Sequence, residues 1–309
     1  MRSSPTSTGP RSAVGADVLV VDPVSGDPQP GVTVQQDLVY DSEHGVEQHL
    51  DLYLPASRPA PLCLWLHGGG WSRGSRNARG TERLMPVAAS GVAIAAVQYR
   101  LSGEAAFPAP LDDARSAVRW LRRNAVDLGL DADRVGVWGA SAGGHLAALL
   151  ALCPDDRDRE LGDSSVQAAV CWFPITDLTL RDTDVPEGPP PPFLSGPLPS
   201  PSHEARLLGA ESVRQVTAAA RAASPVAHVH PGAPPFRLVH GDRDGLVPSE
   251  HSRTFHRLLT AQRVEASLML LAGANHEDPA FDTPPVLAAV AAFLRSTLMP
   301  EGPATAVVG

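Results

Sequence analysis

The segment Gly139-Ala-Ser141-Ala-Gly143 carries the clearest chemical signal in this chain. It places a serine in a Gly-x-Ser-x-Gly pattern between a short apolar run and a long apolar stretch. A serine on a tight turn from strand to helix requires neighbours without bulky side chains, which the two glycines provide. Such a turn would lift the Ser141 hydroxyl clear of a sheet and aim the free N–H groups of the helix start at developing negative charge. The pattern therefore predicts a nucleophilic serine.

Three consecutive glycines form a second signal, in His67-Gly-Gly-Gly-Trp71, directly after the apolar run 62–66. Glycines in a row can place several backbone N–H groups in one concavity, which suits an oxyanion or a phosphate. All 25 basic residues of the chain are arginine, so the lysine that usually completes a phosphate cradle is absent. We therefore expect this loop to bind an oxyanion. The same absence excludes a Schiff-base lysine and a Ser-x-x-Lys dyad.

The composition of the chain limits the classes of partner that it can bind and the cellular compartment in which we expect it. The chain has 309 residues, a formal net charge of −9 and no basic run, so we expect no nucleic-acid partner. No apolar run approaches the length of a membrane helix and no apolar leader follows the N-terminus, so we expect a cytoplasmic protein without a membrane partner. Cys63, Cys153 and Cys171 lie in apolar stretches and are expected to be buried free thiols in a reduced compartment.

Neither a metal nor another cofactor is expected. The pair His228-Val-His230 resembles part of a metal site, but no third ligand is spaced to complete it, and the chain lacks a His-Glu-x-x-His motif. We expect a small molecule to be the partner of this chain. Nothing in the sequence indicates an oligomeric state.

The elements that must position these residues follow from the apolar pattern. Apolar and polar residues alternate from 32 to 54 around a polar turn at 41–45, which predicts an antiparallel hairpin. Short continuous apolar runs come next, as is typical of strands buried on both faces of a parallel sheet. These runs lie at 62–66, 92–97, 135–138, 168–172, 236–239 and 266–271.

Helical patterns separate the apolar runs, at 110–128, 142–152, 249–259 and 285–298. The stretch 142–152 is almost wholly apolar, which predicts a buried helix. Strands that alternate with helices predict an α/β fold with a mostly parallel central sheet, helices on both faces and the N-terminal antiparallel hairpin beside it.

A proline-rich segment interrupts this alternation. Residues 181–201 contain eight prolines, and a helical stretch follows from 203 to about 223. Long irregular segments inside compact domains are usually functional or disordered, so we expect 181–223 to form a lid or cap, with a flexible insertion as the alternative. The remaining chain divides into a disordered or extended N-terminal segment at 1–31, a main domain at 32–298 and a flexible tail at 299–309.

Taken in order, these motifs resemble those of the α/β-hydrolase superfamily. Within it, the chain is similar to esterases and lipases with an HGGG loop, which include the hormone-sensitive-lipase-like, feruloyl-esterase-like and arylformamidase-like enzymes. The resemblance covers about residues 32–298 and implies an α/β-hydrolase fold. It rests on segments 67–71, 98–101, 107–113, 117–121, 139–145, 240–248 and 273–276.

The resemblance also implies a catalytic triad in the chain order serine, acid, histidine. The acid should end a strand within 240–248, where Asp242 and Asp244 both qualify on spacing. The superfamily pattern His-Gly-x-x-Asp-x-x-Val-Pro matches Asp244, which leaves Asp242 as a turn residue. Asp177, at another strand end, is expected to cap a turn. His276, in the loop after the last strand, is the implied base.

The expected reaction is hydrolysis of a carboxylic ester of a small acyl or aryl substrate through an acyl-enzyme on Ser141. Backbone N–H groups are expected to bind the oxyanion, at Gly69, Gly70 and Ala142. Apolar side chains are expected to line the substrate pocket, at Trp71, Phe193 and Leu194.

Other functions remain open on the sequence. Amide hydrolysis of the arylformamidase kind and acyl transfer in specialised metabolism share the acyl-enzyme stage, so the triad does not separate them from ester hydrolysis. A non-catalytic binding protein on a hydrolase fold is a further alternative, because fold does not determine function.

Overall fold

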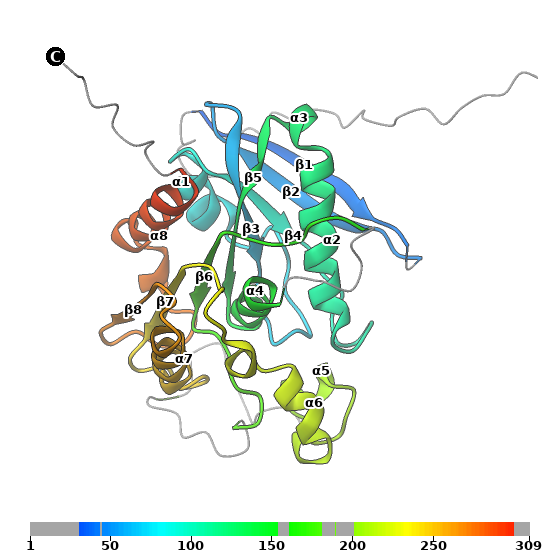
Figure 1. Ribbon diagram of the computed structural model, residues 1–309, viewed down its shortest axis with the longest axis vertical. Coiled ribbons are helices and arrows are strands. Elements are labelled where there is room, and N and C mark those ends of the chain that lie inside the picture. The colour runs from blue at the N-terminus through cyan, green and yellow to red at the C-terminus, as the bar shows by residue number, and fades with distance from the viewer. Residues whose placement is uncertain (1–30, 44, 154–160, 181–188, 190–200, 300–309) are drawn as a thin grey trace, which may run out of the picture.

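A twisted sheet of eight strands forms the centre of the molecule (Figure 1). The structure is a computed structural model that describes residues 31–43, 45–153, 161–180, 189 and 201–299. The spatial order of the strands is β1-β2-β4-β3-β5-β6-β7-β8, and every pair from β4 to β8 is parallel. The strands are β1 (Thr33–Asp41), β2 (Gln48–Leu54), β3 (Ala60–Leu66), β4 (Ala93–Val97), β5 (Leu130–Ala140), β6 (Ala168–Trp172), β7 (Phe236–Gly241) and β8 (Ala266–Leu271).

The predicted hairpin and the mostly parallel sheet are confirmed. β1 pairs antiparallel with β2, and β2 in turn pairs antiparallel with β4. The continuous apolar runs form strands whose residues are buried throughout, as in β3, β4 and β6. β5 begins five residues before the predicted start because Leu130 pairs with Ala60, ahead of an irregularity in the ladder.

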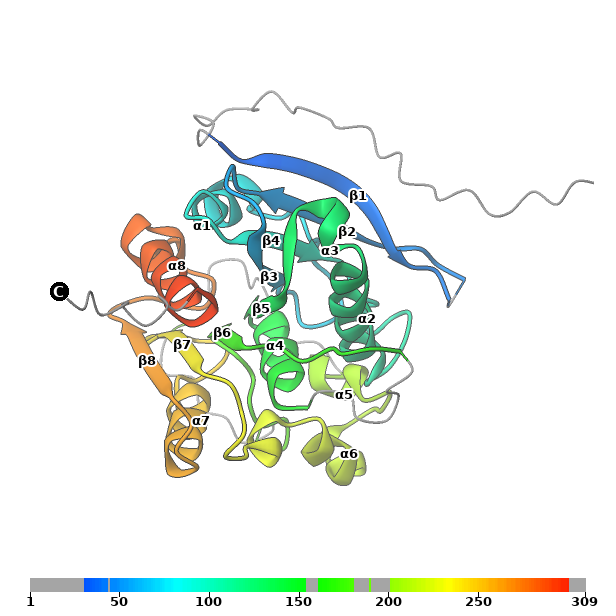
Figure 2. The same cartoon turned by 45° about the horizontal axis from the view of Figure 1, so that its top comes forward.

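Helices cover both faces of the sheet (Figure 2). α2, α4 and α7 contribute to one apolar core, and α1 and α8 to the other. The predicted helix 110–128 is divided at Asn124, whose side-chain amide donates to the carbonyl of Trp120 at 2.8 Å. The helices are α1 (Met85–Ala88), α2 (Ala109–Arg123), α3 (Ala125–Leu128), α4 (Ala142–Leu152), α5 (His203–Leu207), α6 (Thr217–Ala222), α7 (Glu250–Ala261) and α8 (Pro284–Leu298).

Helix α4 is buried along its whole length, as its apolar sequence predicts. Four short helical turns complete the secondary structure of the described residues. A π-helical turn, η1, precedes α1, and three 3₁₀ turns lie near α6, α7 and α8. These turns are η1 (Gly80–Leu84), η2 (Val213–Val216), η3 (Pro225–His228) and η4 (Pro279–Asp282).

The expected lid lies only partly within the described residues. From 201 to 223 the chain forms α5, η2 and α6, while 181–188 and 190–200 fall outside the description, together with Phe193 and Leu194. The expected terminal segments lie almost entirely outside it as well. Among the described helices, none is long and apolar enough to cross a membrane.

Candidate active site

Ser141 lies on the sharp turn between β5 and α4, with backbone angles φ 54° and ψ −117°. Glycines on both sides allow this turn, because a Cβ at Gly139 would lie 2.2 Å from the carbonyl oxygen of Gly143. A Cβ at Gly143 would lie 2.0 Å from the carbonyl oxygen of Leu66, at the end of β3. The predicted requirement for small neighbours therefore has a direct steric cause.

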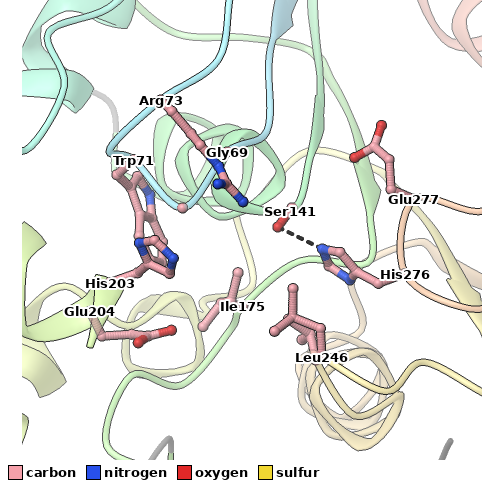
Figure 3. Close-up of a pocket in the computed structure, with 12 residues that line it drawn as sticks. Gly69, Trp71, Arg73, Ser141, Ile175, His203, Glu204, Leu246, His276 and Glu277 are labelled. Carbon is pink, nitrogen blue, oxygen red and sulfur yellow. Dashed lines mark hydrogen bonds between the residues drawn. The ribbon is translucent and has the colours of Figure 1, made fainter. Parts of the chain in front are cut away.

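A chain of hydrogen bonds joins Ser141 to two residues from later loops, and Figure 3 shows its first link, from Ser141 to His276. His276 Nε2 lies 3.0 Å from Ser141 Oγ, and His276 Nδ1 lies 2.7 Å from Asp244 Oδ2. An ionised carboxylate only accepts, so Asp244 places the imidazole proton on Nδ1 and leaves Nε2 to accept from the serine hydroxyl. Ser141, the implied base His276 and the favoured acid Asp244 thus form one hydrogen-bonded triad.

Asp244 is fully buried and strongly held in its ionised form. Its Oδ1 accepts from the backbone N–H groups of Leu246 and Val247, at 2.9 and 2.8 Å. Burial alone would raise the pKa of this carboxyl group, but the charge of His276 and hydrogen bonds from His240 and His276 hold the pKa well below its ordinary value. Asp244 can therefore orient and stabilise the imidazolium without taking up its proton.

The other two candidate acids bind backbone and turn groups instead. Asp242 Oδ1 accepts from the N–H of Gly273 at 2.6 Å. Asp177 Oδ1 accepts from the N–H and the hydroxyl of Thr179, at 2.9 and 2.6 Å. Asp177 thus caps a local turn, as expected, whereas Asp242 binds the neighbouring loop at Gly273 rather than its own turn.

Asn275 connects the two loops that supply the acid and the base. Its side-chain oxygen accepts from the N–H of Gly245 at 2.9 Å and from the N–H of His276 at 2.7 Å. Gly245, which follows the acid, and His276, which is the base, therefore donate to the same acceptor. This shared acceptor fixes the two loops relative to each other.

The glycine loop after β3 lies beside the serine and turns through left-handed backbone angles. Gly69, Gly70 and Trp71 have φ values of 120°, 59° and 52°. A Cβ at Gly68 would lie 3.5 Å from Ser141 Cβ, so the loop passes directly over the nucleophile turn. Among the described residues, no acceptor is bound to the N–H groups of Gly69, Gly70 or Ala142. These donors fit the expected oxyanion site.

Trp71 joins the glycine loop to α4 and, through it, to the end of α6. Its indole N–H donates to His145 Nδ1 at 3.2 Å, and His145 Nε2 lies 2.7 Å from the carbonyl oxygen of Ala223. Burial lowers the pKa of His145 to about 4, against the opposing effect of the Ala223 hydrogen bond. His145 is thus a neutral bridge between three segments. The sequence signal for it is a single polar side chain in an otherwise apolar helix, which must find partners.

Arg83 supports the base loop from behind. It is 2% exposed, donates to Asp282 at 2.6 Å and to Glu277 at 3.1 Å, and lies 4.9 Å from the ring centre of Trp172. Glu277 directly follows the base and has φ 56°, a left-handed conformation that needs support. Phe173 packs edge-on against the His276 ring at 4.6 Å.

A cavity of about 220 Å³ opens in front of Ser141 (Figure 3). Trp71 lines it as expected, whereas Phe193 and Leu194 lie outside the described residues. His203, at the start of α5, closes one side, with Nδ1 3.1 Å from the hydroxyl oxygen of Ser72. The sequence patterns did not reveal the remaining side chains of the wall, which are Arg73, Ile175, Glu204, Leu246, Val247 and Glu277.

The histidine pair that resembles a metal site binds carbonyl groups. His228 Nε2 lies 2.7 Å from the carbonyl oxygen of Ala222, and His230 Nε2 lies 3.2 Å from that of Leu152. Within the described parts of the chain, no three histidine, cysteine or acidic side chains are grouped as metal ligands.

Comparison with known proteins identifies the family. The BD-FAE family model matches residues 50–259. Esterase LipC of Mycobacterium tuberculosis is 32% identical over 249 residues, which cover 77% of this chain and 59% of LipC. This chain therefore spans about three-fifths of the length of that relative.

Solved structures share the fold. A truncated carbohydrate esterase from gut microbiota has a TM-score of 0.76 at 24% identity, covers 88% of this chain and is itself covered to 98%. The propionate-bound esterase Est2 of Thermogutta terrifontis has a TM-score of 0.67 at 27% identity, with 89% and 98% covered. The predicted α/β-hydrolase fold and the resemblance to HGGG-loop enzymes are confirmed. The chain belongs to the BD-FAE family, a feruloyl-esterase-like family of α/β-hydrolases.

Proposed function

We propose that this protein is a serine esterase that hydrolyses carboxylic esters with small acyl groups. The observation that carries the proposal is the hydrogen-bonded triad Ser141–His276–Asp244, whose serine faces a cavity beside the glycine loop. Membership of the BD-FAE family and the likeness to LipC support the same reaction class.

In the proposed mechanism, Ser141 Oγ attacks the ester carbonyl while His276 Nε2 takes the hydroxyl proton. The N–H groups of Gly69, Gly70 and Ala142 stabilise the negative oxygen of the tetrahedral intermediate, where one such donor is worth about 3 kcal/mol. His276 then delivers its proton to the departing alkoxide, which leaves an acyl group on the serine. A water molecule, activated by the same imidazole, releases the acid and restores the serine.

The size of the cavity supports a small acyl group. Its volume of about 220 Å³ falls below the roughly 300–1,000 Å³ of sites that hold drug-sized ligands. Ile175 and Leu246 make the wall of the cavity apolar near the serine. Esterase Est2 of Thermogutta terrifontis has been solved with propionate and with butyrate bound, which accords with short acyl groups.

A chain-length series tests the proposal. Esters of 4-nitrophenol with acyl chains from acetate to laurate should give the highest kcat/KM at acetate to butyrate, and Ser141→Ala should abolish turnover. A fluorophosphonate probe should label Ser141 in the native protein, as shown by mass spectrometry of the peptide. The proposal fails if the probe labels nothing, or if an aryl formamide is cleaved while every ester is left intact. A preference for laurate would contradict only the small size of the acyl pocket and would leave the esterase function in place.

A further inference from the structure

Arg73 is the arginine in the wall of the cavity, and its guanidinium extends toward the space in front of Ser141 (Figure 3). The loop holds its backbone in place, because the Arg73 N–H donates to the carbonyl oxygen of Gly69 at 3.2 Å. Gly69, at φ 120°, packs so closely that a Cβ there would lie 2.1 Å from the Arg73 carbonyl oxygen. The side chain therefore projects from a fixed point beside the nucleophile.

Its neighbours along the same segment all pair with carboxylates, whereas Arg73 pairs with none in the described parts of the chain. Among the described residues, no carboxylate oxygen lies within 4.0 Å of the Arg73 guanidinium, although the chain contains 34 acidic residues. The paired neighbours are Arg76 with Asp37 and Asp51, Arg79 with Asp282, and Arg83 with Asp282 and Glu277. The one arginine of this series that faces the serine thus keeps its planar donors available to a ligand.

The acidic side chains of the cavity limit where an anion can bind. Glu277 is engaged by Arg83 at 3.1 Å, on the side of the base loop. Glu204 lies on the opposite wall, beside His203. An anionic group on a substrate would be attracted by the Arg73 guanidinium, which gives the group a preferred side of the cavity.

We propose that Arg73 binds a free carboxylate on the substrate, so that the preferred esters carry a second, unesterified carboxyl group. This proposal rests on the esterase activity proposed above and specifies its substrate class. A guanidinium matches a carboxylate with two parallel N–H···O bonds, which a neutral amide of the same shape cannot form. The carboxylate can belong to the acyl part or to the alcohol part of the ester.

Two matched pairs of esters test the proposal and separate these sources. Monoethyl succinate against ethyl succinamate places the carboxylate or its neutral amide in the acyl part. Acetoxyacetate against acetoxyacetamide places it in the alcohol part. The wild-type protein should favour the carboxylate by about tenfold or more in kcat/KM in one of the two pairs, the usual scale of a hydrogen-bonded charge.

Variants assign that preference to Arg73. Arg73→Gln should bring the carboxylate-to-amide ratio of kcat/KM close to one, and Arg73→Lys should retain part of it, since a lysine keeps the charge but loses the planar fork. Arg134→Gln is the matched control, because Arg134 is exposed and pairs with Asp131 outside the cavity, and it should keep the wild-type ratio. Thermal melting curves check that each variant is folded.

Three results would overturn the proposal: a wild-type ratio at or below one in both pairs, a ratio that Arg73→Gln leaves unchanged, or an equal loss of the ratio in the Arg134 control. Each of these can occur in an active esterase. Failure of the underlying function is different, because the wild-type protein would then cleave none of the four esters and would resist the fluorophosphonate probe.

Discussion

At the scale of single residues, the two oxygens of Asp244 have separate tasks. Oδ2 accepts from His276 and lies 3.2 Å from His240 Nε2, while Oδ1 caps the backbone of the turn that follows. The carboxylate thus fixes both the tautomer of the base and the shape of its own loop. Asp242, two residues earlier, contacts the neighbouring loop at Gly273 instead.

Asp244→Asn should lower kcat for a short-chain ester by about 10⁴-fold, the scale of loss known for this change in serine proteases. An amide can donate to His276 Nδ1, which moves the imidazole proton to Nε2 and prevents that atom from accepting the serine proton. Asp242→Asn is the control and should retain kcat within about threefold. Steady-state kinetics with 4-nitrophenyl butyrate make the comparison, and equal losses in both variants would contradict the assignment.

His145 makes the stability of the fold depend on pH. Its pKa falls from 6.5 to about 4 in the folded protein, so the unfolded chain takes up a proton at a higher pH than the folded one. The free energy of unfolding should therefore decrease as the pH is lowered from 6.5 to 4, by about 3 kcal/mol from this residue. Urea melts of the wild-type protein and His145→Gln at pH 7 and pH 4.5 measure this.

The glutamine side chain can still accept from Trp71 and donate to Ala223, but it does not titrate, so His145→Gln should lose less stability between the two pH values. Other ionisable groups contribute equally to both proteins and cancel in the difference. The same loss in both would show that His145 is not the source.

At the scale of elements, the base loop between β8 and α8 depends on a distant turn. Arg83, on η1, binds Glu277 and Asp282 at the two sides of this loop and packs against the rings of Trp65 and Trp172. Arg79 binds the same Asp282 but is 41% exposed. The two arginines therefore share a partner and differ in burial.

Arg83→Met should destabilise the protein by about 3 kcal/mol, because it leaves the partly buried Glu277 without its cation and Asp282 with Arg79 alone. It should also lower kcat/KM, since the loop that carries His276 loses its support. Arg79→Met should cost less than about 1 kcal/mol, as is usual for an exposed ion pair. Denaturant melts and ester kinetics on both variants test this, and equal effects would contradict a special role for the buried arginine.

The sequence predicted the elements that have a strong period and missed those that do not. Alternation revealed the β1–β2 hairpin, and continuous apolar runs revealed the parallel strands. A strand buried on one face needs alternating apolar residues, and a strand buried on both faces needs continuous ones. The turn η1 and helix α1 are too short for a helical period and were not predicted. At the break after α2, the Asn124 side chain donates to the Trp120 carbonyl, a contact that leaves no periodic pattern in the sequence.

The candidate site divides in the same way. Ser141, His276 and Asp244 were predicted from motifs, and the structure brings them into hydrogen-bond contact, while their catalytic roles remain predictions. Arg73 and His203 could not be predicted to line one cavity, since they are 130 residues apart in the sequence and α5 contacts the glycine loop only in the folded protein.

At the scale of the whole molecule, the sheet separates two apolar cores. Cys63 on β3 faces the core under α1 and α8, and Cys171 on β6 faces the core under α2, α4 and α7. Burial raises the pKa of both thiols well above its ordinary value, so neither forms a reactive thiolate in the folded protein. Each cysteine therefore reports on one layer.

Both thiols should stay unreactive toward Ellman's reagent in the native protein and become reactive at the same urea concentration, because both layers pack on the same strands and should unfold together. The variant Cys153→Ser removes the background of the partly exposed third thiol. Peptide mapping after labelling distinguishes the two sites. Reaction of Cys63 well before Cys171 would show that the α1–α8 layer opens separately.

The contact between Gly143 and the end of β3 has a consequence for how enzymes of this shape can diversify. Since a Cβ at Gly143 would strike the Leu66 carbonyl oxygen, the nucleophile turn and the glycine loop are locked together as one body. Substitutions at Gly143 should therefore disturb the turn whatever the substrate. The part of the wall supplied by α5 contacts the glycine loop through the His203 side chain, so substitutions on α5 can change the substrate range while the reacting groups stay in place.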